Sequence, residues 1–143
     1  MINFAEGKIK LGEKNILAAS ENELDSLAKE CIIKRQRDAV GAYYYVEDKA
    51  GEMRFGVFIS LKKRKIDWIR LSWLDSPVKS WSDVSDKAMM DEYRVLLKFV
   101  EKELGAPPDH IENRKSIWRL KWGKIDVVYE PRAYQADIFM EPQ

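Results

Sequence analysis

The apolar residues of the chain first show helical spacing after a polar start signal. Ser20 and Glu23 have the spacing of a capping box, in which each side chain accepts a hydrogen bond from the backbone amide of the other residue. Apolar residues then follow at helical spacing: Leu24, Leu27, Ala28 and Cys31. We therefore expect a helix that starts after Ser20, ends between Glu30 and Arg37, and packs Cys31 into the core as a small apolar residue.

A second helix is marked at both ends. Ser85 is a good N-cap residue, Gly105 suits a left-handed C-terminal cap, and Pro107-Pro108 prevents the helix from resuming. Between these signals one stripe of apolar residues repeats every three or four positions: Met89, Tyr93, Leu96, Leu97, Val100 and Leu104. This stripe predicts a long amphipathic helix that packs on a sheet.

The remaining apolar segments are short, rich in β-branched and aromatic residues, and separated by turn residues, which is typical of strands. A weak hairpin is predicted within residues 2–11, around Gly7. Six further strands are predicted at Tyr43–Val46, Phe55–Ile59, Ile66–Trp73, Ile117–Trp122, Ile125–Glu130 and Tyr134–Met140. The pattern predicts an α+β fold: a largely antiparallel sheet with two helices packed on one face.

A length of 143 residues fits one domain, so we assign residues 1–143 to a single domain. A short echo suggests an internal duplication: residues 61–69 and 120–128 share five identities at a constant offset. This would divide the chain into halves 1–75 and 76–143, each a helix with three strands. Two unrelated hairpins with basic turns would also look alike, so both interpretations stay open.

Composition and charge argue against two classes of protein, typical nucleic-acid-binding proteins and membrane-spanning proteins. Lys and Arg number 25 against 24 Asp and Glu, which removes the strong basic field of most nucleic-acid-binding proteins. No apolar run is long enough to span a membrane, and the first eight residues do not resemble a signal peptide. With one cysteine the chain cannot form an internal disulfide, and we expect a cytoplasmic protein.

Residues that could carry catalysis stand alone. His110 lies in a polar loop after the predicted end of the second helix, and Cys31 fits the apolar stripe of the first helix. Neither residue belongs to a recognisable catalytic motif with a partner side chain. No phosphate-binding loop, nucleophile elbow or zinc-ligand spacing is present, and we expect no cofactor, no metal and no enzyme activity. The basic run 62–65 could contact phosphates, but we favour a solvated turn that also discourages pairing at the sheet edge.

Aromatic residues are the unusual feature of the composition, with five tryptophans and six tyrosines. Because successive strand residues point to opposite faces of a sheet, the apolar residues of the strands fall into two sets. One set packs under the helices, and the other would form an exposed aromatic and cationic face, a composition typical of binding hot spots. The candidate partner-binding residues are Tyr43, Tyr45, Phe58, Trp68, Arg70, Arg119 and Lys121.

Short motifs along nearly the whole chain carry a family resemblance. They are Gly7-x-Ile9-x-Leu11-Gly12, the segment 80–85, Trp118-x-x-x-Trp122-Gly123-Lys124-Ile125, and Pro131-Arg132 with Ile138. Together they resemble small cytosolic bacterial immunity proteins of polymorphic or contact-dependent toxin systems. The duplicated pattern also resembles the tandem modules of β-lactamase inhibitor proteins and of small outer-membrane assembly lipoproteins, which bind other proteins through an open sheet face.

The resemblance implies a non-catalytic protein that blocks a cognate toxin domain by stoichiometric binding. It transfers no catalytic residue, and the chain lacks the disulfides and lipidation cysteine of the periplasmic relatives. A small-molecule-binding or enzymatic domain on the same face is the alternative, and nucleic-acid binding through residues 62–65 is a weaker one. The oligomeric state stays open.

Overall fold

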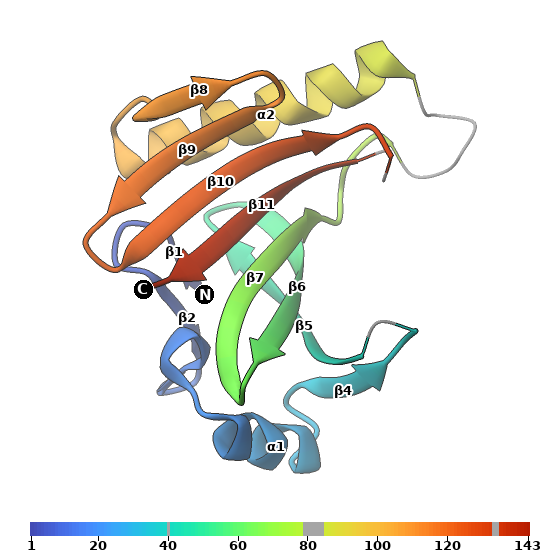
Figure 1. The fold of residues 1–143 in the computed structure, drawn as a ribbon, viewed down its shortest axis with the longest axis vertical. Coiled ribbons are helices and arrows are strands. Elements are labelled where there is room, and N and C mark those ends of the chain that lie inside the picture. The colour runs from blue at the N-terminus through green and yellow to red at the C-terminus, as the bar shows by residue number, and fades with distance from the viewer. Residues whose placement is uncertain (40, 79–84, 133–134) are drawn as a thin grey trace.

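The computed structural model describes residues 1–39, 41–78, 85–132 and 135–143 (Figure 1). Across these residues, eight antiparallel strands form one sheet in the order β4-β5-β6-β7-β11-β10-β9-β8. Their bounds are β4 (Lys34–Arg37), β5 (Ala42–Ala50), β6 (Met53–Lys62), β7 (Lys65–Trp73), β8 (His110–Glu112), β9 (Lys115–Leu120), β10 (Gly123–Glu130) and β11 (Gln135–Pro142). A small sheet contains β1 (Ile2–Asn3), β2 (Lys8–Leu11) and β3 (Lys14–Asn15). The helices are η1 (Ile16–Ala18), α1 (Glu21–Lys29) and α2 (Asp86–Leu104).

The large sheet is built from two antiparallel meanders that meet at their last strands. Strands β4 to β7 follow α1, strands β8 to β11 follow α2, and β7 pairs with β11. Within the described residues, each half of the chain therefore runs from a helix into four consecutive strands. The α+β fold with a largely antiparallel sheet, predicted from the sequence, is confirmed.

One face of the sheet is the core. The strand register aligns its buried residues from strand to strand: Tyr44, Val57, Ile59, Ile69, Leu71, Ile138, Met140, Ile125, Val127 and Trp118. Helix α2 lies on this face over β9 to β11, where the Tyr93 hydroxyl is 2.6 Å from the Ser116 hydroxyl and the Ala136 amide donates to Glu92 at 2.6 Å. Apolar burial against α2 and the N-terminal segment thus defines which face is inside.

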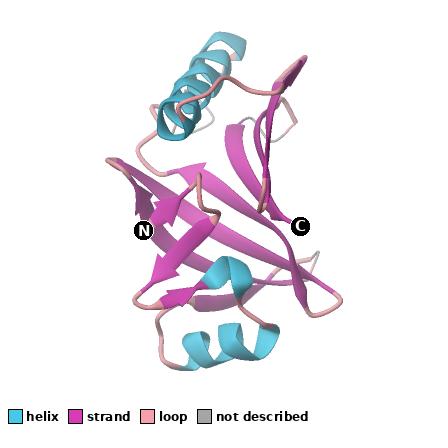
Figure 2. Ribbon diagram, turned by 90° about the vertical axis from the view of Figure 1, so that its left-hand side faces the viewer, coloured by secondary structure: helices cyan, strands magenta, loops and turns pink. Residues whose placement is uncertain are grey.

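The two helices cover different ends of the core face, as Figure 2 shows. The N-terminal strands fill the space between them: Phe4 is buried, its ring lies 6.0 Å from that of Phe99 in α2, and its carbonyl accepts a hydrogen bond from Trp122. Gly7 fits here because a side chain at this position would collide with the Trp122 ring. No helix in the described part of the chain is long and apolar enough to cross a membrane.

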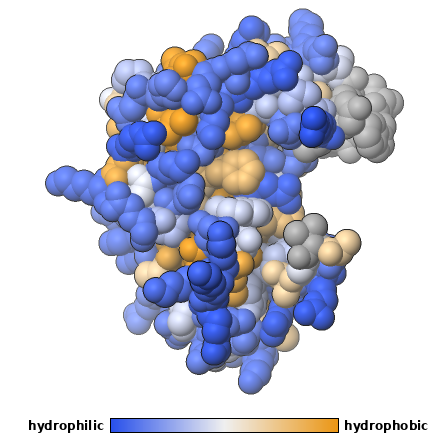
Figure 3. Space-filling view, viewed as in Figure 1, coloured by the Kyte–Doolittle hydropathy of each residue, from blue (hydrophilic) through white to orange (hydrophobic). Residues whose placement is uncertain are grey.

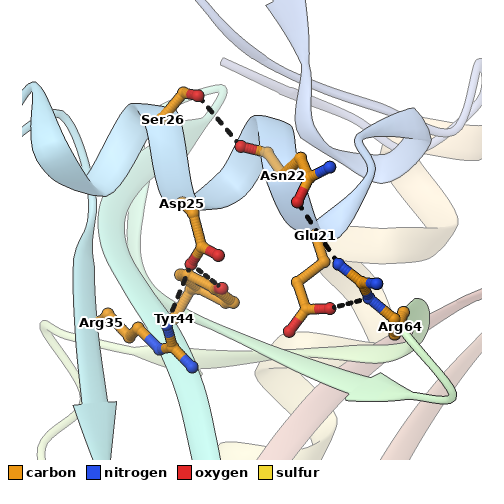
Figure 4. A network of polar contacts seen from close by, with 7 residues as sticks. All are labelled: Glu21, Asn22, Asp25, Ser26, Arg35, Tyr44 and Arg64. Atoms are coloured by element: carbon orange, nitrogen blue, oxygen red, sulfur yellow. Dashed lines mark hydrogen bonds and ion pairs between the residues drawn. The ribbon is translucent and has the colours of Figure 1, made fainter.

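Helix α1 buries Leu24 and Leu27 in the core. It also attaches to the sheet through the polar contacts that Figure 4 shows. The Tyr44 hydroxyl donates to Asp25, which also pairs with Arg35 on β4 at 3.3 Å. Burial and the neighbouring Asp25 carboxylate raise the pKa of Tyr44 to about 12, so the phenol keeps its proton at neutral pH. At the β6–β7 turn, the Arg64 guanidinium pairs with Glu21 at 2.7 Å. Part of the basic run 62–65 therefore fastens α1 to the sheet.

Cys31 does not occupy the core, so this sequence prediction is wrong. Helix α1 ends at Lys29 with Glu30 as its C-cap, and Cys31 is exposed with a φ of 60°. The Ile32 amide bonds to the Leu27 carbonyl and the Cys31 amide to that of Ala28, which is the hydrogen-bond pattern of a Schellman cap. The apolar residue that enters the core after the helix is Ile33.

Two edge strands of the sheet, β4 and β8, were not predicted. All residues of both are exposed and mostly polar, and His110 is the first residue of β8, where it pairs with Glu112 at 3.1 Å.

The two similar segments, 61–69 and 120–128, do not place equivalent residues on the same face of the sheet. Trp68 lies on the face opposite the helices, whereas its counterpart Val127 is fully buried. Residues 80–84 of the family motif and Tyr134 of the last predicted strand lie outside the described residues.

The packing of α2 makes Leu96 the sharpest test of the core. Leu96 is fully buried, whereas Leu97 is only partly buried. Leu96→Ala should lower the free energy of unfolding by about 2–5 kcal/mol, measured by urea denaturation, because it deletes buried apolar volume. The exposed neighbour provides the control, and Val95→Ala should change stability by less than about 0.5 kcal/mol. Equal effects of the two substitutions would contradict the assigned face of α2.

The C-terminal cap of α1 gives a prediction of opposite sign. A left-handed backbone costs a residue with a Cβ about 1–2 kcal/mol, and glycine avoids most of this cost. Cys31→Gly should therefore stabilise the protein by up to about 1 kcal/mol in thermal or urea unfolding, whereas Cys31→Val should destabilise it. Loss of stability in the glycine variant would mean that the Cys31 side chain makes packing contacts after all.

Candidate binding surface

The sheet face opposite the helices carries the candidate site, and we call it the open face. Its residues form cross-strand rows set by the register. One row runs Tyr45, Phe58, Arg70, Phe139, Asp126 and Ile117, from β5 to β9. A neighbouring row brings Tyr43, Ser60 and Trp68 beside it. The open face is therefore aromatic over β5, β6, β7 and β11, and charged further toward β9.

The aromatic side chains of this surface touch one another. The ring of Phe58 lies 4.9 Å from that of Tyr45 and 5.9 Å from that of Tyr43, measured between centroids. On the other side of Arg70, the rings of Trp68 and Phe139 meet edge to face at 5.6 Å. Such contacts hold the rings in fixed orientations, which lowers the entropy cost of presenting them to a partner. We call this set, with Arg70, the aromatic cluster.

Arg70 lies at the centre of the aromatic cluster. Its guanidinium carbon is 4.3 Å from the centroid of the Phe58 ring, which is within the range of a cation–π interaction. Its Nε is buried, and no residue in the described ranges accepts a hydrogen bond from this atom. The cation is therefore held by a ring face rather than by a carboxylate.

A groove runs along the edge of the aromatic cluster. It has a volume of about 370 Å³ and is lined by Tyr43, Phe58, Ser60, Trp68 and Arg70, together with Asp38, Gly41 and Ala42. In the space-filling view the right-hand outline of the molecule is hollowed beside the crossing of β7 and β11 (Figure 3). Aromatic walls around one cation can hold an apolar group and an anion side by side.

Next to the cluster, Asp137 is a buried carboxylate with partners. Its oxygens accept hydrogen bonds from Ser72 at 2.9 Å and from Gln135 at 2.7 Å, and it is 6% exposed. Burial raises the pKa of Asp137 above its ordinary value, although the positive charge of Arg70 and the two hydrogen bonds oppose the rise. Desolvation outweighs the nearby charge at this position.

Two of the sequence-predicted site residues lie away from the cluster. Arg119 is exposed on β9, with β10 and β11 between it and β7, and its amide donates to Asp109. Lys121 is exposed in the turn between β9 and β10. Near them, Lys124 pairs with Asp126 at 3.4 Å and with Glu141 at 3.2 Å, so this end of the open face is a network of compensated charges.

The structure brings together Tyr43, Tyr45, Phe58, Trp68 and Arg70. Sequence reasoning missed Phe139, although its alternation with Ile138 and Met140 was the available signal. It also missed Ser72, Gln135 and Asp137, which no motif marks. Among the described residues, no group of three or more His, Cys, Asp or Glu side chains could hold a metal ion.

Comparison with protein-family models, with curated proteins and with solved structures finds no match. The functional argument therefore rests on the geometry of the open face.

The raised pKa of Asp137 predicts how stability depends on pH. The folded protein binds this proton more tightly than the unfolded chain, so the contribution of the carboxyl group to stability is present below about pH 3.9 and is lost as pH rises through the folded pKa. Asp137→Asn removes this loss. The variant should therefore gain stability relative to the native protein between pH 4 and pH 7, measured by urea denaturation at both values.

A second substitution tests the same balance from the other side. The Ser72 hydroxyl stabilises the charged carboxylate, so Ser72→Ala should raise the pKa of Asp137 further and steepen the fall of stability with pH. A stability difference between Asp137→Asn and the native protein that does not change with pH would contradict the assigned cause.

Proposed function

We propose that this chain is a non-catalytic binding module that holds a protein partner on its open face. The aromatic cluster is the single observation that carries the proposal. Aromatic and arginine side chains dominate binding energy at protein interfaces, and here they are contiguous and partly exposed on a sheet face without a covering helix in the described residues. The paired charges toward β9 suit the rim of such an interface.

The specific partner that we propose is a toxin domain, which the chain would block by stoichiometric association in the cytoplasm. This part rests on the resemblance of the sequence motifs to immunity proteins. The net charge of +1 favours toxins whose active site does not need an acidic mimic of nucleic acid. Binding alone would suffice for such a role, so no reaction is required of the chain.

The groove favours one second candidate, a small-molecule ligand. Its volume of about 370 Å³ is within the range of ligand sites, and it has aromatic walls with one cation. Nucleic-acid binding through residues 62–65 has less support, because Arg64 is already paired with Glu21 and the three lysines that remain, Lys62, Lys63 and Lys65, offer few phosphate contacts.

The proposal is tested by titrating the purified chain with the toxin domain that we expect a neighbouring gene to encode, using calorimetry, and by growth rescue on co-expression. We expect one-to-one binding. Tyr45→Ala and Trp68→Ala should each weaken it by about 2 kcal/mol, or roughly 30-fold, because they remove rigid apolar area from the cluster. Circular dichroism melts should show that both variants remain folded.

The double variant Lys62→Ala, Lys63→Ala is the matched control, since it removes two exposed charges and leaves the Arg64 contact with α1 intact. It should change affinity by less than the aromatic variants do. Affinity that collapses only in this control and falls steeply with salt would place the site on the basic turn and refute the proposal.

A further inference from the structure

Arg70 differs from the other arginines of the chain. Four of them form ion pairs with carboxylates: Arg35, Arg54, Arg64 and Arg94. Arg114 lies over the ring of Tyr129, and the remaining three are exposed. Within the described residues, Arg70 alone among the arginines is half-buried, and it has neither an ion pair nor a hydrogen-bond acceptor there.

The surroundings of Arg70 explain why it stays without an acceptor. Its cross-strand neighbours on the open face are Phe58 on β6 and Phe139 on β11, and neither can accept a strong hydrogen bond. The carboxylate of Asp137 is close enough for Arg70 to lower its pKa, but its hydrogen bonds come from Ser72 and Gln135 and none joins it to Arg70. The fold thus holds a half-buried guanidinium over the Phe58 ring, at the edge of a groove.

We propose that Arg70 binds a carboxylate side chain of the protein partner, seated in the groove beside an apolar residue of the same segment. The inference rests on the proposed function and names the chemistry of the partner. A guanidinium pairs with a carboxylate through two parallel hydrogen bonds, and the interaction is strong where aromatic rings exclude water.

The charge balance favours a carboxylate over a phosphate. Among the described residues that line the groove, Arg70 is the single cation and Asp38 the single carboxylate, and the Asp137 carboxylate is close enough to interact with the charge of Arg70. A dianion would face these two acids with only one positive charge to offset it, whereas a carboxylate carries a single charge. The rings of Tyr43, Phe58 and Trp68 would contact the apolar neighbour of the acid.

The test uses two short peptides as probes, acetyl-Leu-Glu-Leu-amide and acetyl-Leu-Gln-Leu-amide, titrated into the full chain. Affinity is measured by calorimetry in every variant, and in the native chain the nitrogen–proton NMR signal of Arg70 Nε, assigned by its absence in Arg70→Gln, locates the bound peptide. The glutamate peptide should shift this signal and bind about tenfold more tightly than the glutamine peptide. In Arg70→Gln this preference should disappear.

Arg119→Gln is the matched control, because it makes the same substitution on the same face outside the groove, and the preference should remain. Equal binding of the two peptides, no binding of either, or loss of the preference in Arg119→Gln would overturn the inference. Stronger displacement by inorganic phosphate than by acetate would assign the groove to phosphate and overturn it as well.

The same substitutions separate this inference from the proposed function. In the toxin-domain titration, Arg70→Gln should weaken binding about as much as Trp68→Ala does. If Trp68→Ala weakens binding and Arg70→Gln does not, the open face binds the partner without a carboxylate at Arg70. If neither does, the proposed function fails.

Discussion

The pairing of β7 with β11 is the contact on which the rest of the structure depends. Three residue pairs make it: Ile69 with Met140, Arg70 with Phe139, and Leu71 with Ile138. The first and third pairs are fully buried and join the cores of the two meanders. The middle pair points to the open face, and it places an aromatic ring of the second meander beside the arginine of the first. One short stretch of register therefore creates both a continuous core and the centre of the candidate site.

Local sequence signals predicted the elements that are held together by contacts between residues close in sequence, such as helices and hairpins. Ser85 and Gly105 delimit α2 where their capping chemistry requires it, and the hairpins of β5 to β7 follow from turn residues and alternation. The edge strands β4 and β8 have no buried residue and so leave no apolar period to detect. Cys31 matched the helical period, but the helix had already ended two residues earlier. Periodicity alone does not locate a helix end when the capping residue is not glycine.

The candidate site was predicted by face but not by position. Alternation places Tyr43, Phe58, Arg70 and Arg119 on one side of the sheet, and the register agrees. Alternation carries no information about strand order, and here β11, the last strand in sequence, inserts between β7 and β10. That insertion moves Arg119 away from the cluster and brings Phe139 into it. Non-local strand pairing is thus the missing information, because it depends on contacts between residues far apart in the chain.

Two buried or half-buried polar groups at the open face, Asp137 and Arg70, differ in how far their desolvation is compensated. Buried polar groups are normally satisfied inside a protein, and Asp137 follows this rule through Ser72 and Gln135. Arg70 does not, since its Nε is buried without an acceptor among the described residues, and its charge is offset by a ring face and by the Asp137 carboxylate without a hydrogen bond. A hydrophobic residue at this place would pack between Phe58 and Phe139 without that desolvation cost. The Phe58 ring and the charge of Asp137 offset part of this cost within the fold. The buried Nε stays out of reach of a partner, whereas the terminal nitrogens of the half-buried guanidinium can donate to a carboxylate that a bound partner supplies.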